Sequence, residues 1–166
     1  MKIFIGGTRS IKHLDNLIQE RLQTIYQKNF DVLVGDCYGV DALVQDYYKK
    51  MNYEKVHVYA SAGKARNNVG GWPITDVAVF AGSHGFGFYS QKDIKMANDA
   101  DYGFMIWDGK SKGTYNNIVN LVNQDKAVLV YMSTTGSMKT LKNAADLQKL
   151  NSGNISSVGS MVGLPI

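Results

Sequence analysis

Short apolar runs alternate along this chain with stretches whose apolar residues recur at helical spacing. Runs of this kind, closed by glycine or polar residues, are typical of strands buried on both faces, and the stretches between them of amphipathic helices. The predicted strands are Lys2–Ile5, Asp31–Val34, Lys55–Tyr59, Tyr102–Trp107 and Ala127–Tyr131. The predicted helices are a segment ending near Lys28, a second carrying Ala42 to Tyr48, and Lys92–Ala100, Tyr115–Asn123 and Met138–Leu150. This order predicts an α/β fold, a Rossmann-like, doubly wound, mainly parallel sheet of about five to seven strands with helices on both faces.

The segment Ala60–Gln91 lacks a clear period and is rich in glycine and aromatic residues. A stretch of this length is either a functional loop or lid, or a connection that contains one short strand, here Val77–Phe80. His84 is the one histidine that we keep as a site candidate. The aromatic region Trp72–Tyr89 is a candidate surface for homo-oligomer formation.

Length and composition narrow the classes of protein to consider. The 166 residues suit one compact domain over 1–150, followed by a tail over 151–166 that is rich in Ser, Gly and Asn and is expected to be loosely held. The net charge of +4 suits an anionic small molecule but is too small to favour nucleic acid. A single cysteine, Cys37, excludes a disulfide within the chain and favours a reducing cytoplasm. The first residues predict neither a signal peptide nor a membrane span.

Three predicted strands are each followed by a glycine-rich loop, and these loops are Gly6–Ser10, Gly35–Asp41 and Asp108–Thr114. Such loops at the carboxyl ends of parallel strands meet where doubly wound sheets bind ligands. Glycine lets a backbone approach a phosphate, Arg9 offers a forked donor, and Lys110 and Lys112 add charge. Asp36 and Asp41 could accept hydrogen bonds from ribose hydroxyls, and Arg66 could reach in from the long middle segment. The candidate ligand-binding residues are Gly6, Gly7, Thr8, Arg9, Gly35, Asp36, Gly39, Asp41, Arg66, Gly109, Lys110, Ser111, Lys112, Gly113 and Thr114.

Each of these features also has a purely structural explanation. Tight turns after strands require glycine, Asp41 suits a helix start, and Lys110 and Lys112 suit a solvated surface. The loops match neither the G-x-x-x-x-G-K-[ST] nor the G-x-G-x-x-G pattern, so phosphoryl transfer and NAD chemistry have little support. We expect no required cofactor and no metal, with a nucleotide of unknown identity as the ligand.

The sequence contains no evident catalytic constellation. Cys37 lacks a paired base and is interpreted as a small packed residue. Asp93 and Asp108 are the candidate catalytic carboxylates, as nucleophile or base in glycosidic-bond chemistry, with helix capping and turn closure as the structural alternatives.

Taken together, the motifs of this chain resemble those of a known superfamily. They are Gly6-Gly7-Thr8-Arg9, Gly35-Asp36-x-x-Gly39-x-Asp41, Lys92-Asp93-x-x-Met96 and Asp108-Gly109-Lys110-Ser111-Lys112-Gly113-Thr114. With them the chain, from about Lys2 to Tyr131, resembles the small single-domain members of the SLOG superfamily of Rossmann-like nucleotide-binding domains. That superfamily includes the core of DNA-processing protein A, the LOG phosphoribohydrolases and molybdenum-cofactor carrier proteins. The resemblance implies a nucleotide or nucleotide-derived ligand with its phosphate on the last of these loops.

One position departs from the LOG pattern. LOG enzymes carry Pro-Gly-Gly-x-Gly-Thr-x-x-Glu, and the position of their hydrolytic glutamate falls here on Asn117, which can neither take a proton nor form a glycosyl ester. The related nucleoside deoxyribosyltransferases also need a glutamate after this strand. We therefore expect a nucleotide-binding sensor or carrier. The alternatives are an N-glycosidic-bond hydrolase, in which Asp93, Asp36 or Asp108 substitutes for the glutamate, and a nucleic-acid-binding module.

Overall fold

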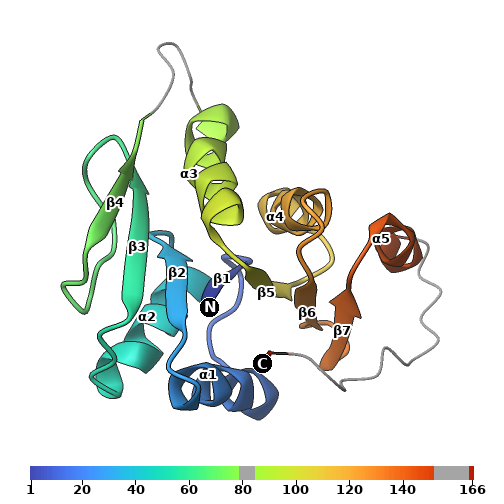
Figure 1. The fold of residues 1–166 in the computed structure, drawn as a ribbon, viewed down its shortest axis with the longest axis horizontal. Helices are drawn as coiled ribbons and strands as arrows, with labels where there is room; N and C mark the ends of the chain where they lie inside the picture. Colours follow the sequence, from blue (N-terminus) through green and yellow to red (C-terminus); the bar gives the residue numbers. More distant parts are fainter. Residues whose placement is uncertain (79–84, 152–164) are drawn as a thin grey trace.

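A seven-stranded sheet forms the middle layer of the molecule (Figure 1). The computed structural model describes residues 1–78, 85–151 and 165–166, and side chains for these ranges except 85–89 and 151. The strand order is β4-β3-β2-β1-β5-β6-β7; β1 to β6 run parallel and β7 is antiparallel. The strands are β1 (Lys2–Gly7), β2 (Asp31–Gly35), β3 (Val56–Ser61), β4 (Ile74–Val77), β5 (Tyr102–Trp107), β6 (Val128–Met132) and β7 (Ser137–Leu141). The predicted doubly wound α/β fold is confirmed.

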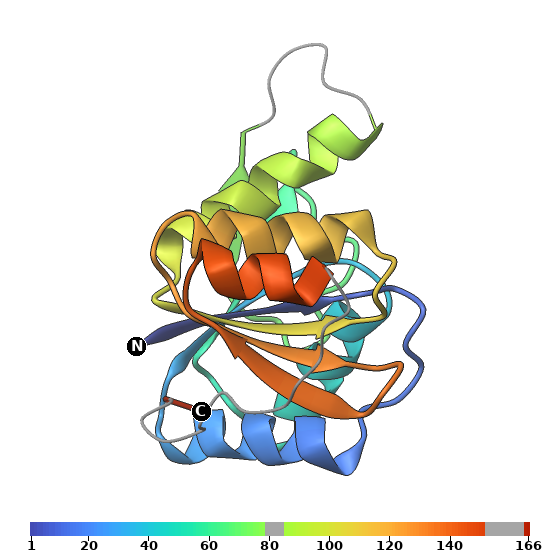
Figure 2. The ribbon, with the colours of Figure 1, turned by 90° about the vertical axis from the view of Figure 1, so that its right-hand side faces the viewer.

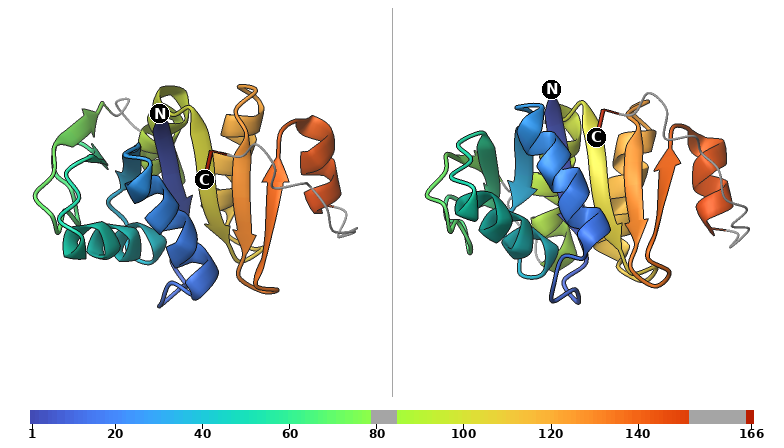
Figure 3. Two further views of the ribbon diagram at one scale, coloured as in Figure 1. Left: turned by 60° about the horizontal axis from the view of Figure 1, so that its bottom comes forward. Right: turned by 90° about the horizontal axis from the view of Figure 1, so that it is seen from below.

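Helices cover both faces of the sheet, because the central strands are apolar on both sides. In β1, Ile3 and Ile5 are buried against one layer of helices and Phe4 against the other. The helices α1 and α2 cover one face of the sheet (Figure 3). The helices α3, α4 and α5 cover the opposite face (Figure 2). The helices are α1 (Asn16–Gln27), α2 (Val40–Lys50), α3 (Gly85–Asp99), α4 (Lys112–Val122) and α5 (Ala144–Asn151).

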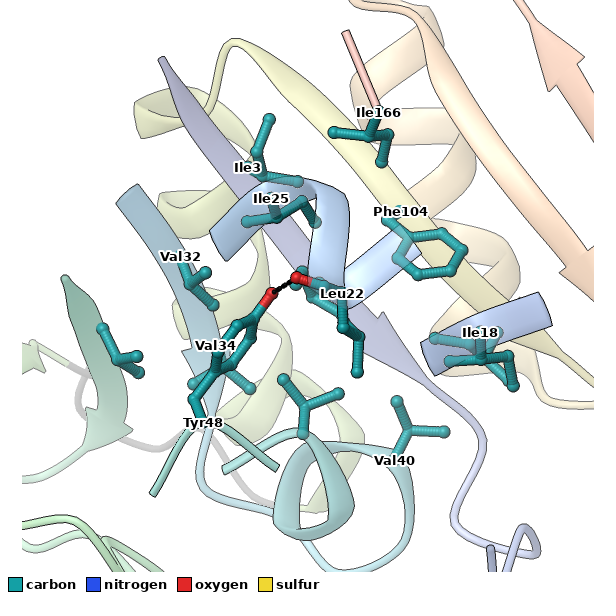
Figure 4. Close-up of a cluster of buried hydrophobic side chains, with 14 of the residues drawn as sticks. Ile3, Ile18, Leu22, Ile25, Val32, Val34, Val40, Tyr48, Phe104 and Ile166 are labelled. Atoms are coloured by element: carbon teal, nitrogen blue, oxygen red, sulfur yellow. Dashed lines mark hydrogen bonds between the residues drawn. The ribbon is translucent and has the colours of Figure 1, made fainter. Parts of the chain in front are cut away.

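The helices α1 and α2 pack one cluster of the apolar core against the sheet (Figure 4). Ile18, Leu22 and Ile25 lie on one face of α1 and are fully buried against the sheet. Tyr48 of α2 is equally buried, and its hydroxyl donates to the Leu22 carbonyl oxygen at 3.1 Å. This bond satisfies the one polar atom of a large buried ring and fixes α2 relative to α1.

The strand order reverses between β1 and β5. From β1 to β4 the strands are added one after another toward one edge of the sheet. The helix α3 then returns the chain to the other side of β1, where β5 pairs with β1 in parallel and Tyr102 lies opposite Ile3. In doubly wound sheets, such a reversal separates the loops at the carboxyl ends of the two strands and leaves a crevice.

The prediction of one helix over Met138–Leu150 is wrong in its first part. Residues Ser137–Leu141 form β7, which pairs with β6 after a turn closed by Gly136, whose φ is 63° and whose N–H donates to the Met132 carbonyl oxygen. Leu141 fits the helical spacing of Leu147 and Leu150, but it pairs with Val128 at the end of the strand instead. The helix α5 begins only at Ala144.

The segment Ala60–Gln91, which has no clear period in the sequence, contains a strand and the start of a helix. The short strand is Ile74–Val77 rather than Val77–Phe80, since Ile74 pairs with Val58 directly after Pro73. The helix predicted from Lys92 begins at Gly85, and its glycines hid this first part because they disfavour helix. Phe80, His84 and residues 152–164 of the tail lie outside the described residues. Trp72, proposed above as part of an interface, is 9% exposed, and its indole N–H donates to the Tyr53 carbonyl oxygen at 2.8 Å.

Candidate functional site

A pocket of about 510 Å³ lies at the carboxyl ends of β1 and β5, where the strand order reverses. This volume is typical of small-molecule sites. Its walls come from the loops after β1, β2 and β5, from one face of α3 and from the first two turns of α4. The predicted site residues that line it are Gly6, Gly7, Thr8, Arg9, Asp41, Asp93, Asp108, Lys110, Ser111, Gly113 and Thr114.

Other predicted residues do not reach the wall of this pocket, and several wall residues were missed. Those that do not reach it are Gly35, Asp36, Gly39, Arg66, Gly109 and Lys112. The wall residues that were not among the predicted site residues are Phe4, Ser10, Cys37, Lys92, Met96 and Asn117.

Close backbone contact explains the glycine that ends β1. A Cβ atom on Gly7 would lie 2.4 Å from the Ile106 carbonyl oxygen and 2.7 Å from a methyl group of Val40. The next residue, Thr8, donates its N–H to the same Ile106 oxygen at 3.0 Å. Any larger residue at position 7 would push β1 away from β5, so the glycine sets the spacing of the two strands at the pocket floor.

Asp108 closes the turn that follows β5. Its Oδ1 accepts from the backbone N–H groups of Lys110 and Ser111, at 2.9 and 2.8 Å. Its Oδ2 accepts from the hydroxyls of Thr8 and Ser10, at 2.9 and 3.2 Å. Partial burial opposes ionisation, but these four hydrogen bonds outweigh it and hold the pKa of Asp108 below its ordinary value. The carboxylate thus ties the β1 loop to the β5 loop, which is the turn-closing alternative considered for this residue.

The helix α4 starts at the pocket wall. Ser111 is its N-cap, and the Ser111 hydroxyl accepts from the N–H of Thr114 at 3.3 Å. The predicted loop therefore ends at Ser111, and Gly113 and Thr114 belong to the first helical turn. A Cβ atom on Gly113 would meet no atom within 4 Å. The amino end of α4, where helical N–H groups lack intrahelical partners, is thus open to the pocket.

Asp36 and Arg66 form an ion pair behind the pocket. The Arg66 guanidinium donates to both Asp36 oxygens, from Nη2 at 2.7 Å and from Nε at 3.0 Å, and the Arg66 backbone N–H donates at 3.0 Å. Burial opposes ionisation of Asp36, which is 2% exposed, but the bonds from Arg66 lower its pKa below the ordinary value. The same pairing raises the pKa of Arg66. These two predicted ligand residues thus hold the middle segment against the β2 loop.

A buried lysine on α3 lies between two acidic side chains. Lys92 is 2% exposed and its ammonium group lies 2.7 Å from Asp93 Oδ1. A Cβ atom built on Gly35 would lie 2.8 Å from the Lys92 ammonium and 2.3 Å from Asp41 Oδ2, so both groups converge on that glycine. Burial by itself would lower the pKa of Lys92, but Asp93 and Asp41 raise it above the ordinary value. The pocket wall therefore holds an ammonium group that is charged at neutral pH.

Asp41 is the buried acid of this group. It lies in the first turn of α2, and its Oδ2 accepts from the backbone N–H of Cys37 at 3.1 Å. Asp41 thus closes the β2 loop, while the N-cap of α2 is Gly39. Burial raises the pKa of Asp41 to about 6, although the charge of Lys92 partly offsets the effect. Its protonation state thus changes just below neutral pH.

Two guanidinium groups flank Cys37 at the pocket wall. Its sulfur lies 2.9 Å from Arg66 Nη2 and 3.6 Å from Arg9 Nη2. Burial, together with the charge of Asp41, nevertheless raises the pKa of the Cys37 thiol. The thiol therefore stays protonated at neutral pH, which is consistent with a packed residue rather than a nucleophile.

The missed lysine had a signal in the sequence. Lys92, Met96 and Ala100 follow one another at four-residue intervals, and Met96 and Ala100 are both buried. This spacing places Lys92 on the inner face of α3, and a lysine there must find acidic partners. Lys92 belongs to the motif Lys92-Asp93-x-x-Met96, in which it has no predicted role of its own.

No family model matches this chain, and no curated protein sequence matches it significantly. Within the part of the chain that the structure describes, no group of three or more acidic, histidine or cysteine side chains could hold a metal ion. None of the described helices has the length and apolar character needed to cross a membrane.

Proposed function

We propose that the pocket between β1 and β5 binds a nucleotide or a nucleotide-derived phosphorylated molecule, and that the protein acts as a sensor or carrier of that ligand. The observation that carries the proposal is the open amino end of α4 at Gly113, inside a pocket at the reversal of strand order. An anion placed there would accept bonds from helical N–H groups and interact favourably with the helix dipole.

The balance of charges around the pocket supports an anionic ligand. Asp93 is paired with Lys92, and four hydrogen bonds already satisfy Asp108. Among the described residues, Arg9 and Lys110 form no ion pair although both line the pocket. These two cations are therefore available to a phosphate. The resemblance to the SLOG superfamily adds support, since it implies a phosphate on this same loop.

A Gly113→Val variant tests where the phosphate binds. The new side chain meets open space in the free protein, and valine is no worse in a helix than glycine, so the fold should be unaffected. Ligand-observed NMR against a pool of nucleotides should show binding to the wild-type protein and at least a hundredfold loss in the variant. Asn123→Val, at the exposed far end of the same helix, is the matched control and should bind normally. Equal affinity in the Gly113→Val variant would overturn the phosphate position.

The position of Asp93 favours cleavage of an N-glycosidic bond as a second candidate function. Its carboxylate lies at the pocket wall with 22% of the side chain exposed, and the buried Lys92 ammonium orients it. A ligand signal that persists over hours in the same NMR samples indicates binding without turnover. Release of free base and sugar phosphate, lost in Asp93→Asn but kept in Cys37→Ala, would indicate the hydrolase instead.

A further inference from the structure

A groove between α3 and α4 continues from the pocket. Its volume is about 310 Å³, and it shares Asp93, Gly113 and Asn117 with the pocket wall. The two helices that form it lie side by side above the sheet (Figure 2). A ligand whose anionic group occupied the amino end of α4 could therefore extend into this groove without leaving the protein surface.

The groove offers different chemistry from the pocket. From α4 it presents Asn116 and Asn120, which are four residues apart and so share one helix face. Each carboxamide carries two donors and an acceptor, which matches the mixed hydrogen-bonding edge of a heterocycle. Apart from Asp93, the side chains among its described lining are uncharged.

Apolar side chains also line the groove. Ile94 of α3 is 40% exposed, and Val119 of α4 lines the groove as well. A planar ring needs apolar contact with its faces and hydrogen bonds at its edge. The groove provides both, whereas the pocket provides Arg9, Lys110 and a helix terminus.

We propose that the groove between α3 and α4 binds the nucleobase of the ligand, with Asn116 and Asn120 reading its polar edge and Ile94 contacting its face. This inference rests on the proposed function, because the phosphate at Gly113 sets where the base can reach. It adds a specificity-determining subsite, and it places the sugar beside Asp93 and Asn117, where the two hollows join.

Comparison of whole and truncated ligands tests the subsite. Dissociation constants are measured by calorimetry for the four ribonucleoside 5′-monophosphates and for ribose 5-phosphate, which lacks the base. We expect at least one nucleotide to bind about tenfold or more tightly than ribose 5-phosphate. In the Asn116→Ala/Asn120→Ala double variant this advantage should vanish, while the affinity for ribose 5-phosphate stays within twofold of wild type.

The variants should fold, since alanine favours helix over asparagine and Asn116 is exposed. Asn123→Ala, outside the groove on the same helix, should keep the full nucleotide advantage. Equal binding of all five compounds to wild type would overturn the base subsite but leave the phosphate site standing. The base subsite would also be overturned if the double variant still bound a nucleotide more tightly than ribose 5-phosphate by the wild-type factor. The same holds if the double variant lost as much affinity for ribose 5-phosphate as for the nucleotide. If no compound binds wild type, the proposed function itself fails and the subsite fails with it.

Discussion

Replacing the buried acid Asp41 by asparagine should make the stability of this protein less sensitive to pH. In the wild type, burial raises the pKa of Asp41 from its ordinary 3.8 to about 6. Each pKa unit corresponds to about 1.4 kcal/mol, so the ionised Asp41 destabilises the fold by about 3 kcal/mol relative to the protonated form. Asparagine keeps an oxygen for the Cys37 N–H and carries no charge to bury.

The sign of the effect follows from the two states of the chain. Below pH 3.8 the group is protonated whether the chain is folded or unfolded, and its ionisation costs nothing. Between pH 3.8 and 6 the unfolded chain loses the proton first, so the free energy of unfolding of the wild type falls as pH rises; above about pH 6 the cost is constant. The difference in free energy of unfolding, Asp41→Asn minus wild type, should therefore rise by about 2 to 3 kcal/mol between pH 4 and pH 7.5.

Urea denaturation followed by circular dichroism at half-unit pH steps measures this difference. Because the subtraction removes the titration of groups common to both proteins, the remaining slope belongs to Asp41 and its coupling to Lys92. Asp46→Asn changes an exposed acid of the same helix and should alter the free energy of unfolding by less than about 0.5 kcal/mol throughout. A difference that stays flat, or falls as pH rises, would refute the assignment of Asp41 as a buried acid with a raised pKa.

Three further substitutions test the loops around the pocket. Gly39→Ala should lower the free energy of unfolding, measured by urea denaturation, by about 2 kcal/mol or more. The reason is that φ of Gly39 is 77° and the new Cβ would lie 2.4 Å from the Arg9 Cα. A loss below about 0.5 kcal/mol would contradict this geometry. Arg66→Ala should lower the free energy of unfolding by about 3 kcal/mol, because it leaves the buried Asp36 carboxylate unpaired. The loss should be greatest above the lowered pKa of Asp36, where the carboxylate is ionised, and Asp36→Asn in the same background should recover part of it. Ser111→Ala should lower the thermal midpoint by the equivalent of about 1 kcal/mol through loss of the α4 cap, and Ser111→Asp, which restores a capping acceptor, should not.

The strands of the central sheet could be predicted because burial on both faces leaves only apolar residues in them. All five predicted runs are strands in the structure, with bounds that differ by at most two residues at either end. The antiparallel strand β7 could not be found in this way. It lies at the sheet edge with most of its side chains half-buried, so its pattern carries no two-sided burial signal and its Leu141 matches a helical period by coincidence.

The positions of the site loops could be predicted from topology, but the roles of their side chains could not. Parallel strands end at one edge, so Gly7 and Gly113 had to lie near each other. Which charged groups meet depends on tertiary contacts: Arg66 is 30 residues from Asp36 and satisfies it. Lys92 pairs with its neighbour Asp93, but only the packing of the fold brings its ammonium group near Asp41, on a helix of the opposite layer. A single sequence contains no record of those pairings.

The most direct test of nucleotide binding is an NMR titration of the ¹⁵N-labelled protein with each of the four ribonucleoside 5′-monophosphates. The account predicts that at least one of them shifts the backbone amide signals of Gly113 and Gly7 in a saturable way. The signal of Gly71, which lies in the segment just before the edge strand β4, should not move. Saturable shifts that spare Gly113, or no shifts with any of the four at millimolar concentration, would contradict nucleotide binding in this pocket.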